Sequence, residues 1–148
     1  MDPTRQTILL VEDNEHDAFL LRRALEKARI ECSLQVVVNG QEALDYLAGV
    51  SAYADRDRYP MPVLVFLDLT LPRVHGLEVL AWARLQPELV GLAFVILSSS
   101  DGERDRRRAA ALGVRAYLVK PPTVDMMARA GLLHDRDPSA APEESGET

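Results

Sequence analysis

Five short apolar runs alternate with helical segments along this chain, and this alternation restricts the fold more than any other feature. The runs cover residues 7–13, 33–38, 63–72, 92–100 and 114–120. Strands that are apolar along their whole length are typical of a parallel sheet covered by helices on both faces. Because crossover connections between parallel strands are right-handed, the pattern predicts a doubly wound α/β sheet.

Helical periodicity fills the segments between these runs. Five helices are predicted, over residues 14–30, 41–50, 76–86, 100–113 and 123–135. Ser100 and Glu103 have the spacing of a capping box at the start of the fourth helix, and Gly113 is a natural stop at its end. The proline-containing segment 51–62 is predicted to be a polar loop.

The chain is predicted to form one domain over residues 1–134, followed by a disordered acidic tail over residues 135–148 that is rich in Pro, Ser, Ala and Glu. No output domain is expected after the last helix. The net charge of −6 argues against nucleic acid as a partner. The single cysteine, Cys32, and the lack of a signal peptide or membrane span predict a cytoplasmic location.

Polar residues stand where four of the apolar runs end. Glu12 and Asp13 end the first run, Asp68 lies in the third, Ser98 in the fourth, and Lys120 closes the fifth. Doubly wound sheets bind ligands outside the carboxyl ends of their strands, so these side chains are expected to share one edge. The glycine-rich loop of a dinucleotide site is absent after the first run, which disfavours a nucleotide ligand.

These residue types favour phosphoryl chemistry. Three carboxylates held together repel one another unless a cation lies among them, and oxygen ligands of this kind suit Mg²⁺. Lys120, one of only two lysines in the chain, adds a positive charge able to meet a phosphoryl oxygen. A carboxylate beside such cations can attack phosphorus and form an acyl phosphate.

Four motifs, "LLVEDN", "FLDLTLPRVHG", "VILSSS" and "AYLVKPP", occur in this order on the predicted strands. Together they resemble the receiver domain of two-component response regulators, over residues 5–134. The resemblance implies a flavodoxin-like sheet with strand order 2-1-3-4-5 and five helices. It also implies a signalling domain, in which slow loss of its own phosphoryl group is the expected catalytic activity.

The resemblance assigns the acceptor and metal roles by position. Asp68 matches the phosphoacceptor of the family. Glu12 and Asp13 match the acidic pair that holds Mg²⁺, with Asp13 the direct ligand, and Thr70 would add its backbone carbonyl. Lys120 matches the family lysine.

The resemblance also assigns a conformational switch. Ser98 matches the hydroxyl residue that turns toward the phosphoryl group, and small Ser99 leaves room for that group. Tyr117 matches the aromatic residue that swings inward on activation. The peptide bond before Pro121 would be cis.

Simpler structural roles remain open for several of these residues. Glu12 and Asp13 could cap the following helix, since acidic residues favour helix N-termini. Ser98 could be part of a helix cap, and Tyr117 could be an ordinary core aromatic. The histidines do not form a ligand set and are expected to face solvent.

The expected partner is a sensor histidine kinase. The long 51–62 loop and the segment "LQPELVGLAFVILSSS" resemble small response regulators paired with bacterial and cyanobacterial phytochromes, which implies a bacteriophytochrome kinase. It also implies a homodimer through the fourth helix, fifth strand and fifth helix. Three alternatives remain: a phosphorelay intermediate or phosphate sink, an interaction domain without phosphorylation, and a Mg²⁺-dependent aspartyl phosphohydrolase. Thr70 stands where the general acid of those hydrolases would be.

Overall fold

Strands and helices form in the alternating order that the sequence predicts. The computed structural model describes residues 6–99, 102–129 and 131. The strands are β1 (Gln6–Val11), β2 (Cys32–Val37), β3 (Leu64–Asp68), β4 (Ala93–Ser98) and β5 (Ala116–Val119). The α-helices are α1 (Glu15–Lys27), α2 (Gly40–Ala48), α3 (Gly76–Arg84), α4 (Glu103–Ala111) and α5 (Val124–Arg129). Short 3₁₀ helices occur at Ser51–Tyr53 and Pro87–Leu89.

The strands make one parallel sheet in the order β2-β1-β3-β4-β5. The order confirms the predicted doubly wound α/β fold. The chain moves from β1 to one side of the sheet and then returns past it to the other side. The order therefore reverses between β1 and β3, which is where such sheets place their ligand sites.

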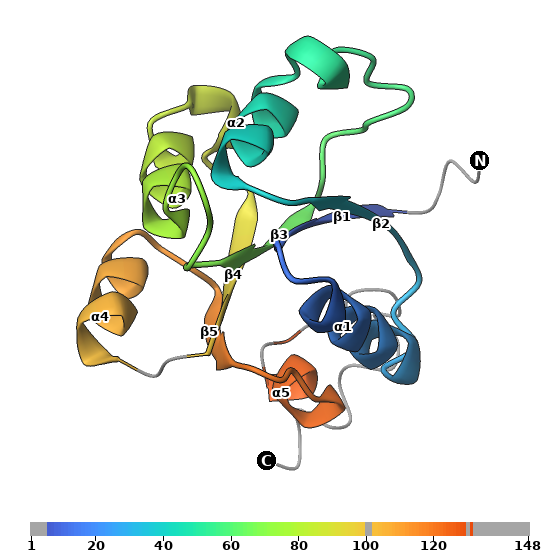
Figure 1. Ribbon diagram of the computed structural model, residues 1–148, viewed down its shortest axis with the longest axis vertical. Helices are drawn as coiled ribbons and strands as arrows, with labels where there is room; N and C mark the ends of the chain where they lie inside the picture. Colours follow the sequence, from blue (N-terminus) through green and yellow to red (C-terminus); the bar gives the residue numbers. More distant parts are fainter. Residues whose placement is uncertain (1–5, 100–101, 130, 132–148) are drawn as a thin grey trace.

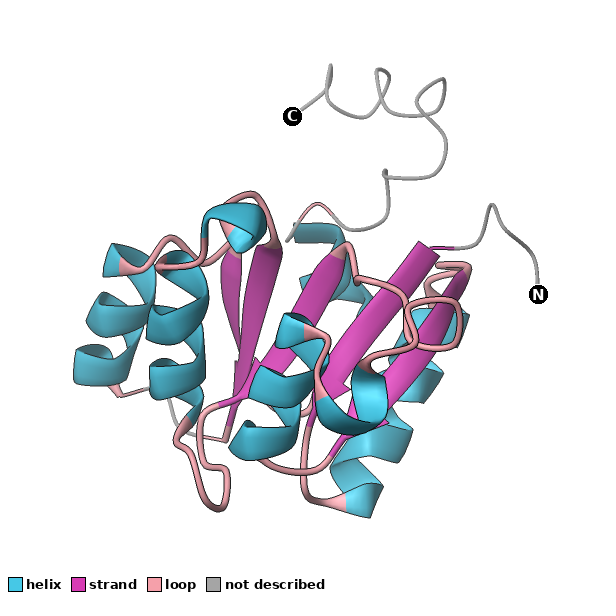
Figure 2. Cartoon of the chain, turned by 90° about the horizontal axis from the view of Figure 1, so that it is seen from above, coloured by secondary structure: helices cyan, strands magenta, loops and turns pink. Residues whose placement is uncertain are grey.

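Helices cover both faces of the sheet, as Figures 1 and 2 show. On one face, α1 and α5 pack on the strands, with Leu21, Leu25 and Met127 buried against them. On the other face, α2, α3 and α4 pack on a second core that includes Leu80 and Ala109. Burial on both faces explains why the strands are apolar throughout. In the described part of the chain, no helix has the length and apolar character needed to span a bilayer.

The register brings the strand ends to one level. Val11 is paired with Leu67, so Glu12 follows β1 at the height of Asp68. Ser98 at the end of β4 is paired with Val119, so Lys120 follows β5 immediately beyond it. The polar residues thus meet at one edge because the parallel strands end there together.

All five strands end earlier than the sequence predicts, three of them by two residues or more. The first run was expected to continue to residue 13, the third to residue 72 and the fourth to residue 100, but the strands end at Val11, Asp68 and Ser98. Beyond Asp68 the backbone turns, with the Leu71 amide donating to the Leu69 carbonyl at 3.2 Å. Asp68 and Ser98 are thus the last residues of their strands, whereas Glu12, Asp13 and Lys120 lie in the loops that follow β1 and β5.

The last two helices also differ from prediction. The fourth begins at Glu103 with Gly102 as N-cap and no side-chain capping hydrogen bond, so it starts later than the proposed capping box. Ser100 lies outside the described residues. Gly113 has a positive φ of 78°, as expected of a helix stop. The fifth helix ends at Arg129 rather than residue 135, and the predicted tail 135–148 lies outside the described residues.

Candidate functional site

The site lies at the carboxyl edge of the sheet, where β1 and β3 end side by side. Asp68 is the last residue of β3 and is buried, although it is charged. Its Oδ1 accepts a hydrogen bond from the Thr70 amide at 3.1 Å. Its Oδ2 accepts one from Lys120 Nζ at 3.2 Å. The aliphatic residues before Asp68 fill the core and thereby fix its carboxylate at this edge.

Glu12 and Asp13 follow β1 and differ in exposure. The Glu12 amide extends the ladder by donating to the Val37 carbonyl at 3.0 Å, which directs the buried Glu12 side chain into the site. Its Oε2 accepts a hydrogen bond from the Asn14 amide at 3.2 Å. Asp13, the next residue along the extended backbone, is exposed.

Lys120 is the cationic centre of the site. Its Nζ lies 2.8 Å from Glu12 Oε1, 3.0 Å from Asp17 Oδ2 and 3.2 Å from Asp68 Oδ2. The backbone holds this lysine in place, because its amide donates to the Ser98 carbonyl at 2.8 Å. The peptide bond between Lys120 and Pro121 is cis, the geometry that the resemblance implied.

Electrostatics in the site shift the pKa of both partners in its shortest ion pair. Burial, reinforced by the nearby Asp68 charge, raises the pKa of Glu12 from 4.5 to about 7, although Lys120 opposes the shift. Burial alone would lower the pKa of the Lys120 ammonium. The surrounding carboxylates outweigh burial and raise that pKa above its usual value, so Lys120 stays charged.

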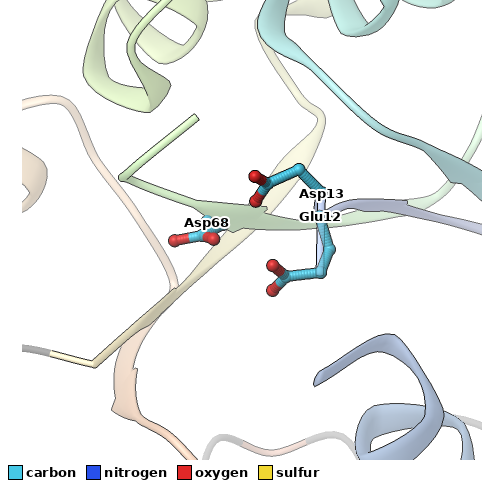
Figure 3. Close-up of side chains that lie close together, drawn as sticks. All are labelled: Glu12, Asp13 and Asp68. Carbon is cyan, nitrogen blue, oxygen red and sulfur yellow. The ribbon is translucent and has the colours of Figure 1, made fainter. Parts of the chain in front are cut away.

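The residues present fit a divalent cation. Glu12, Asp13 and Asp68 each offer a carboxylate oxygen, and these oxygens lie within 4.8 Å of one another. Figure 3 shows the three carboxylates gathered where β1 and β3 end. Three carboxylates, those of Glu12, Asp17 and Asp68, contact the Lys120 ammonium group. Hard oxygen donors in this number suit Mg²⁺ or Mn²⁺.

A family model, described as the response regulator receiver domain, matches residues 8–130. The chain belongs to this family. This family membership confirms the predicted function of the chain, a phosphoacceptor domain in two-component signalling.

Two of the relatives of this receiver domain are known from solved structures as response regulators of phytochromes. The bacteriophytochrome response regulator AtBRR is 40% identical, with a TM-score of 0.79 over 88% of this chain and 93% of AtBRR. The phosphorylated cyanobacterial phytochrome response regulator RcpA is 32% identical, with a TM-score of 0.75 over 89% of this chain and 93% of RcpA.

A third relative is the response regulator Rcp1 of Synechocystis. It is 35% identical over 115 residues, which make up 78% of this chain and 76% of Rcp1. The Mn²⁺-bound form of Rcp1 has a solved structure that matches with a TM-score of 0.74 and 31% identity, over 88% of this chain and 93% of that one. The comparisons agree with the predicted resemblance to small phytochrome-associated receivers.

The remaining predicted residues of this receiver lie in β4, in β5 and in the segments that follow β3 and β4. Ser98 is buried at the end of β4, and Ser99 beyond it is exposed. Thr70 is also exposed, and its amide contacts the Asp68 carboxylate. Tyr117 lies in β5, half-buried, with the Arg106 guanidinium 4.6 Å from the centre of its ring. The signalling roles of these four residues remain predictions.

The simpler roles considered for the acids are filled by other residues. Asn14, rather than Glu12 or Asp13, is the N-cap of α1, and its Oδ1 accepts from the Asp17 amide at 2.9 Å.

His75 is exposed and caps α3, its Nδ1 accepting from the Leu77 amide at 3.1 Å.

The sequence did not single out Asp17 as a site residue. This aspartate lies in the first turn of α1, yet it contacts a lysine 103 positions later in the chain. Acidic residues are common in first turns of helices, so the residue type alone carried no signal. The spacing from the Asn14 cap, which turns Asp17 toward the strand ends, is the one local feature that could have indicated it.

Proposed function

We propose that Asp68 accepts a phosphoryl group from a phosphohistidine of a sensor histidine kinase. A carboxylate oxygen of Asp68 would form the new bond to phosphorus as the bond from phosphorus to the histidine nitrogen breaks. The freed imidazole nitrogen then takes a proton from water. The observation that carries the proposal is the contact of Asp68 Oδ2 with Lys120 Nζ at 3.2 Å, inside a group of acids that needs further positive charge.

Lys120 would stabilise the charge that develops during transfer. Its ammonium already faces the acceptor carboxylate, so no rearrangement of the lysine is needed as negative charge moves onto the phosphoryl oxygens. The raised pKa of Lys120 keeps this ammonium protonated at neutral pH.

Glu12, Asp13 and Asp68 would hold Mg²⁺, with the Thr70 carbonyl as a further ligand. When bound, the ion would neutralise charge on the phosphoryl oxygens. Support comes from the three clustered carboxylates and from the Mn²⁺-bound structure of the relative Rcp1. The choice of Mg²⁺ over Mn²⁺ is part of the proposal.

The proposed response is a change in the face made by α4, β5 and α5. Ser98 would turn to donate to a phosphoryl oxygen, in space left by small Ser99, and Tyr117 would move into the volume that Ser98 vacates. Tyr117 is half-buried between α4 and the sheet, a position from which inward motion would alter this face. We infer that a homodimer forms through it.

The proposed partner is a phytochrome-type histidine kinase in the cytoplasm, because relatives such as AtBRR and RcpA are phytochrome response regulators. The direction of phosphate flow is a separate question. A forward signal requires a target that binds the phosphorylated face, whereas a relay intermediate or phosphate sink would pass the group to a second histidine.

The test uses a small phosphodonor, phosphoramidate, whose nitrogen–phosphorus bond resembles that of phosphohistidine. With Mg²⁺, the wild-type chain should gain one phosphoryl group by intact mass, and a chelator should prevent it. The variant Asp68→Asn should gain none. Asp57→Asn, which changes an exposed loop carboxylate, should be labelled like the wild type. Full labelling of Asp68→Asn would rule out the proposed acceptor.

A further inference from the structure

Asp17 contributes a fourth carboxylate to the site, from an element outside the strand ends. Its Oδ2 accepts a hydrogen bond from Lys120 Nζ at 3.0 Å. The Asp17 side chain is 31% exposed, and the Lys120 side chain is 13% exposed. The contact joins the start of α1 to the end of β5, two elements on either side of the acidic group.

Helix capping does not account for the Asp17 carboxylate. In a capping box, the acid at the third helical position reaches back to the amide of the N-cap residue. Here the amide of the N-cap residue, Asn14, donates to Glu12 Oε2 instead. Asp17 takes part in the cap through its own amide, which donates to Asn14 Oδ1. Its carboxylate is therefore left for Lys120.

The three carboxylates around Lys120 belong to two groups. Lys120 Nζ donates hydrogen bonds to Asp17 and Asp68 at 3.0 and 3.2 Å, and it forms an ion pair with Glu12 Oε1 at 2.8 Å. Glu12 and Asp68 are also members of the candidate metal cluster, whereas Asp17 is not. Without Asp17, the Lys120 ammonium would be attracted only toward Glu12 and Asp68, the two acids that a bound metal ion would also need.

We propose that Asp17 is a positioning residue that holds the Lys120 ammonium on the α1 side of the site. In this position Lys120 stays in contact with Asp68, while the Asp17 carboxylate offsets the attraction of the ammonium toward Glu12 and Asp68, the two acids that it shares with the metal cluster. The inference deepens the proposed function and rests on it for its consequence in phosphoryl transfer. The contact itself and its effect on cation binding do not depend on that function.

The first measurement is Mg²⁺ affinity, by isothermal titration calorimetry on the full chain. Asp17→Asn should weaken Mg²⁺ binding about three- to fivefold, the range that one partly exposed ion pair supports. Glu15→Gln is the matched control, because Glu15 is an exposed acid in the same helical turn. It removes the same charge and should change the affinity by less than about twofold. Equal effects of the two variants would overturn the proposal.

A double-mutant cycle tests whether Asp17 acts through Lys120. In a Lys120→Met background, Asp17→Asn should weaken Mg²⁺ binding no more than Glu15→Gln does. An undiminished effect of Asp17→Asn in that background would show that Asp17 acts on the cation directly, and would contradict the proposal. Asp17→Glu keeps a carboxylate and should restore part of the lost affinity.

The mobility of the Lys120 side chain provides a further measurement. It would not change if Asp17 served only to stabilise the fold. The chain has two lysines, Lys27 and Lys120, so selective ¹³C labelling at the lysine ε carbon gives two signals in an NMR spectrum. Asp17→Asn should make the Lys120 side chain more mobile on the ps–ns timescale, and Glu15→Gln should not. Unchanged Lys120 mobility in a folded Asp17→Asn variant would overturn the proposal.

The outcomes separate this inference from the proposed function. Labelling of Asp68→Asn by phosphoramidate would remove the acceptor assignment while leaving the effects of Asp17 on Mg²⁺ and on Lys120 intact. Conversely, an Asp17→Asn variant that binds Mg²⁺ and orders Lys120 like the wild type would remove the inference alone. If Asp17→Asn unfolds under the conditions used, the conservative Asp17→Glu and the Lys120→Met background still test it.

Discussion

The backbone of Gly76 lies directly against the carbonyl oxygen of Asp68, with no room for a side-chain carbon between them. A Cβ on Gly76 would overlap that oxygen and would lie 2.8 Å from Leu69 Cα. The Gly76 amide donates to the Leu69 carbonyl at 3.0 Å, which ties the start of α3 to the end of β3. The placement of the Asp68 carboxylate therefore depends on a glycine eight residues later.

Gly76→Ala should displace the backbone at Asp68 and reduce phosphorylation. Overpacking of this kind costs about 1–3 kcal/mol of stability. We expect a lower urea midpoint and slower labelling by phosphoramidate. Gly91→Ala is the control, because a Cβ at Gly91 meets no atom within 4 Å. Labelling and stability of Gly76→Ala equal to those of Gly91→Ala would contradict the prediction.

Glu12 should make the stability of the metal-free protein depend on pH in an unusual direction. Its pKa rises from 4.5 to about 7 on folding, mainly through burial, so the folded protein binds a proton that the unfolded chain releases. The stability from this group is fully present below about pH 4.5 and is lost as pH rises through about 7. Its size is at most roughly 3 to 4 kcal/mol, since a pKa change of one unit corresponds to about 1.4 kcal/mol.

The measurement is the free energy of unfolding in urea between pH 4.5 and 8, with a chelator present. The difference between wild type and Glu12→Gln isolates the Glu12 contribution from that of the other titratable groups. The wild type should lose stability relative to Glu12→Gln as pH rises. A difference that does not change with pH would contradict the assignment.

Arg84 should be important for stability although it lies outside the site. Its Nε donates to the Leu112 carbonyl at 2.7 Å, and its two terminal nitrogens donate to the carbonyls of Leu92 and Gly113 at 3.1 and 3.0 Å. The guanidinium also lies 5.2 Å from the centre of the Phe94 ring. It thus joins α3 to the end of α4 and to the start of β4.

Replacing Arg84 by Ala should therefore cost about 2–4 kcal/mol in urea denaturation, because several carbonyls lose a charged donor. Arg84→Lys should restore little of this, since an ammonium does not reproduce the planar fork of a guanidinium. Arg104→Ala, an exposed change on α4, should stay within about 0.5 kcal/mol of the wild type. Wild-type stability of Arg84→Lys would show that the fork geometry is unimportant.

The fold and most of the site could be predicted because one rule connects them. Continuous apolar runs indicate a parallel sheet, and a parallel sheet ends all its strands at one edge. Asp68 and Lys120 follow from this rule, since Asp68 is the one acid within the third run and Lys120 closes the fifth. The order of strands and helices depends on the apolar pattern along the chain and not on side-chain contacts. It could therefore be predicted, and it agrees with the structure.

Contacts that depend on tertiary packing could not be predicted in the same way. The segment 51–62 reads as a polar loop, yet Tyr53 and Tyr59 pack together with ring centres 5.0 Å apart. The Tyr46 hydroxyl, from α2, donates to the Pro60 carbonyl at 2.9 Å. The contact of Asp17 with Lys120 is of the same kind. The partners are 6, 14 and 103 residues apart, and no periodic pattern in the sequence indicates contacts at such spacings.

The contact of Arg106 with Tyr117 lies within the face proposed to change on phosphorylation, since it joins α4 to β5. A guanidinium 4.6 Å from a ring centre favours the present position of the ring. An exposed cation–π contact contributes about 0.5–1 kcal/mol. If Tyr117 moves inward on activation, this contact must be lost, so Arg106 stabilises the unphosphorylated conformation.

Arg106→Ala should therefore make the activated conformation easier to reach. We expect beryllofluoride, a stable mimic of the phosphoryl group, to bind this variant about two- to fivefold more tightly than the wild type, the change that a loss of 0.5–1 kcal/mol allows. Binding is measured by NMR titration with Mg²⁺ present. Arg107→Ala is the control, since Arg107 pairs with Glu103 on the same exposed helix face. Unchanged or weaker binding by Arg106→Ala would contradict a stabilising role for this contact, because the loss of a contact made only before activation can shift the equilibrium in one direction alone.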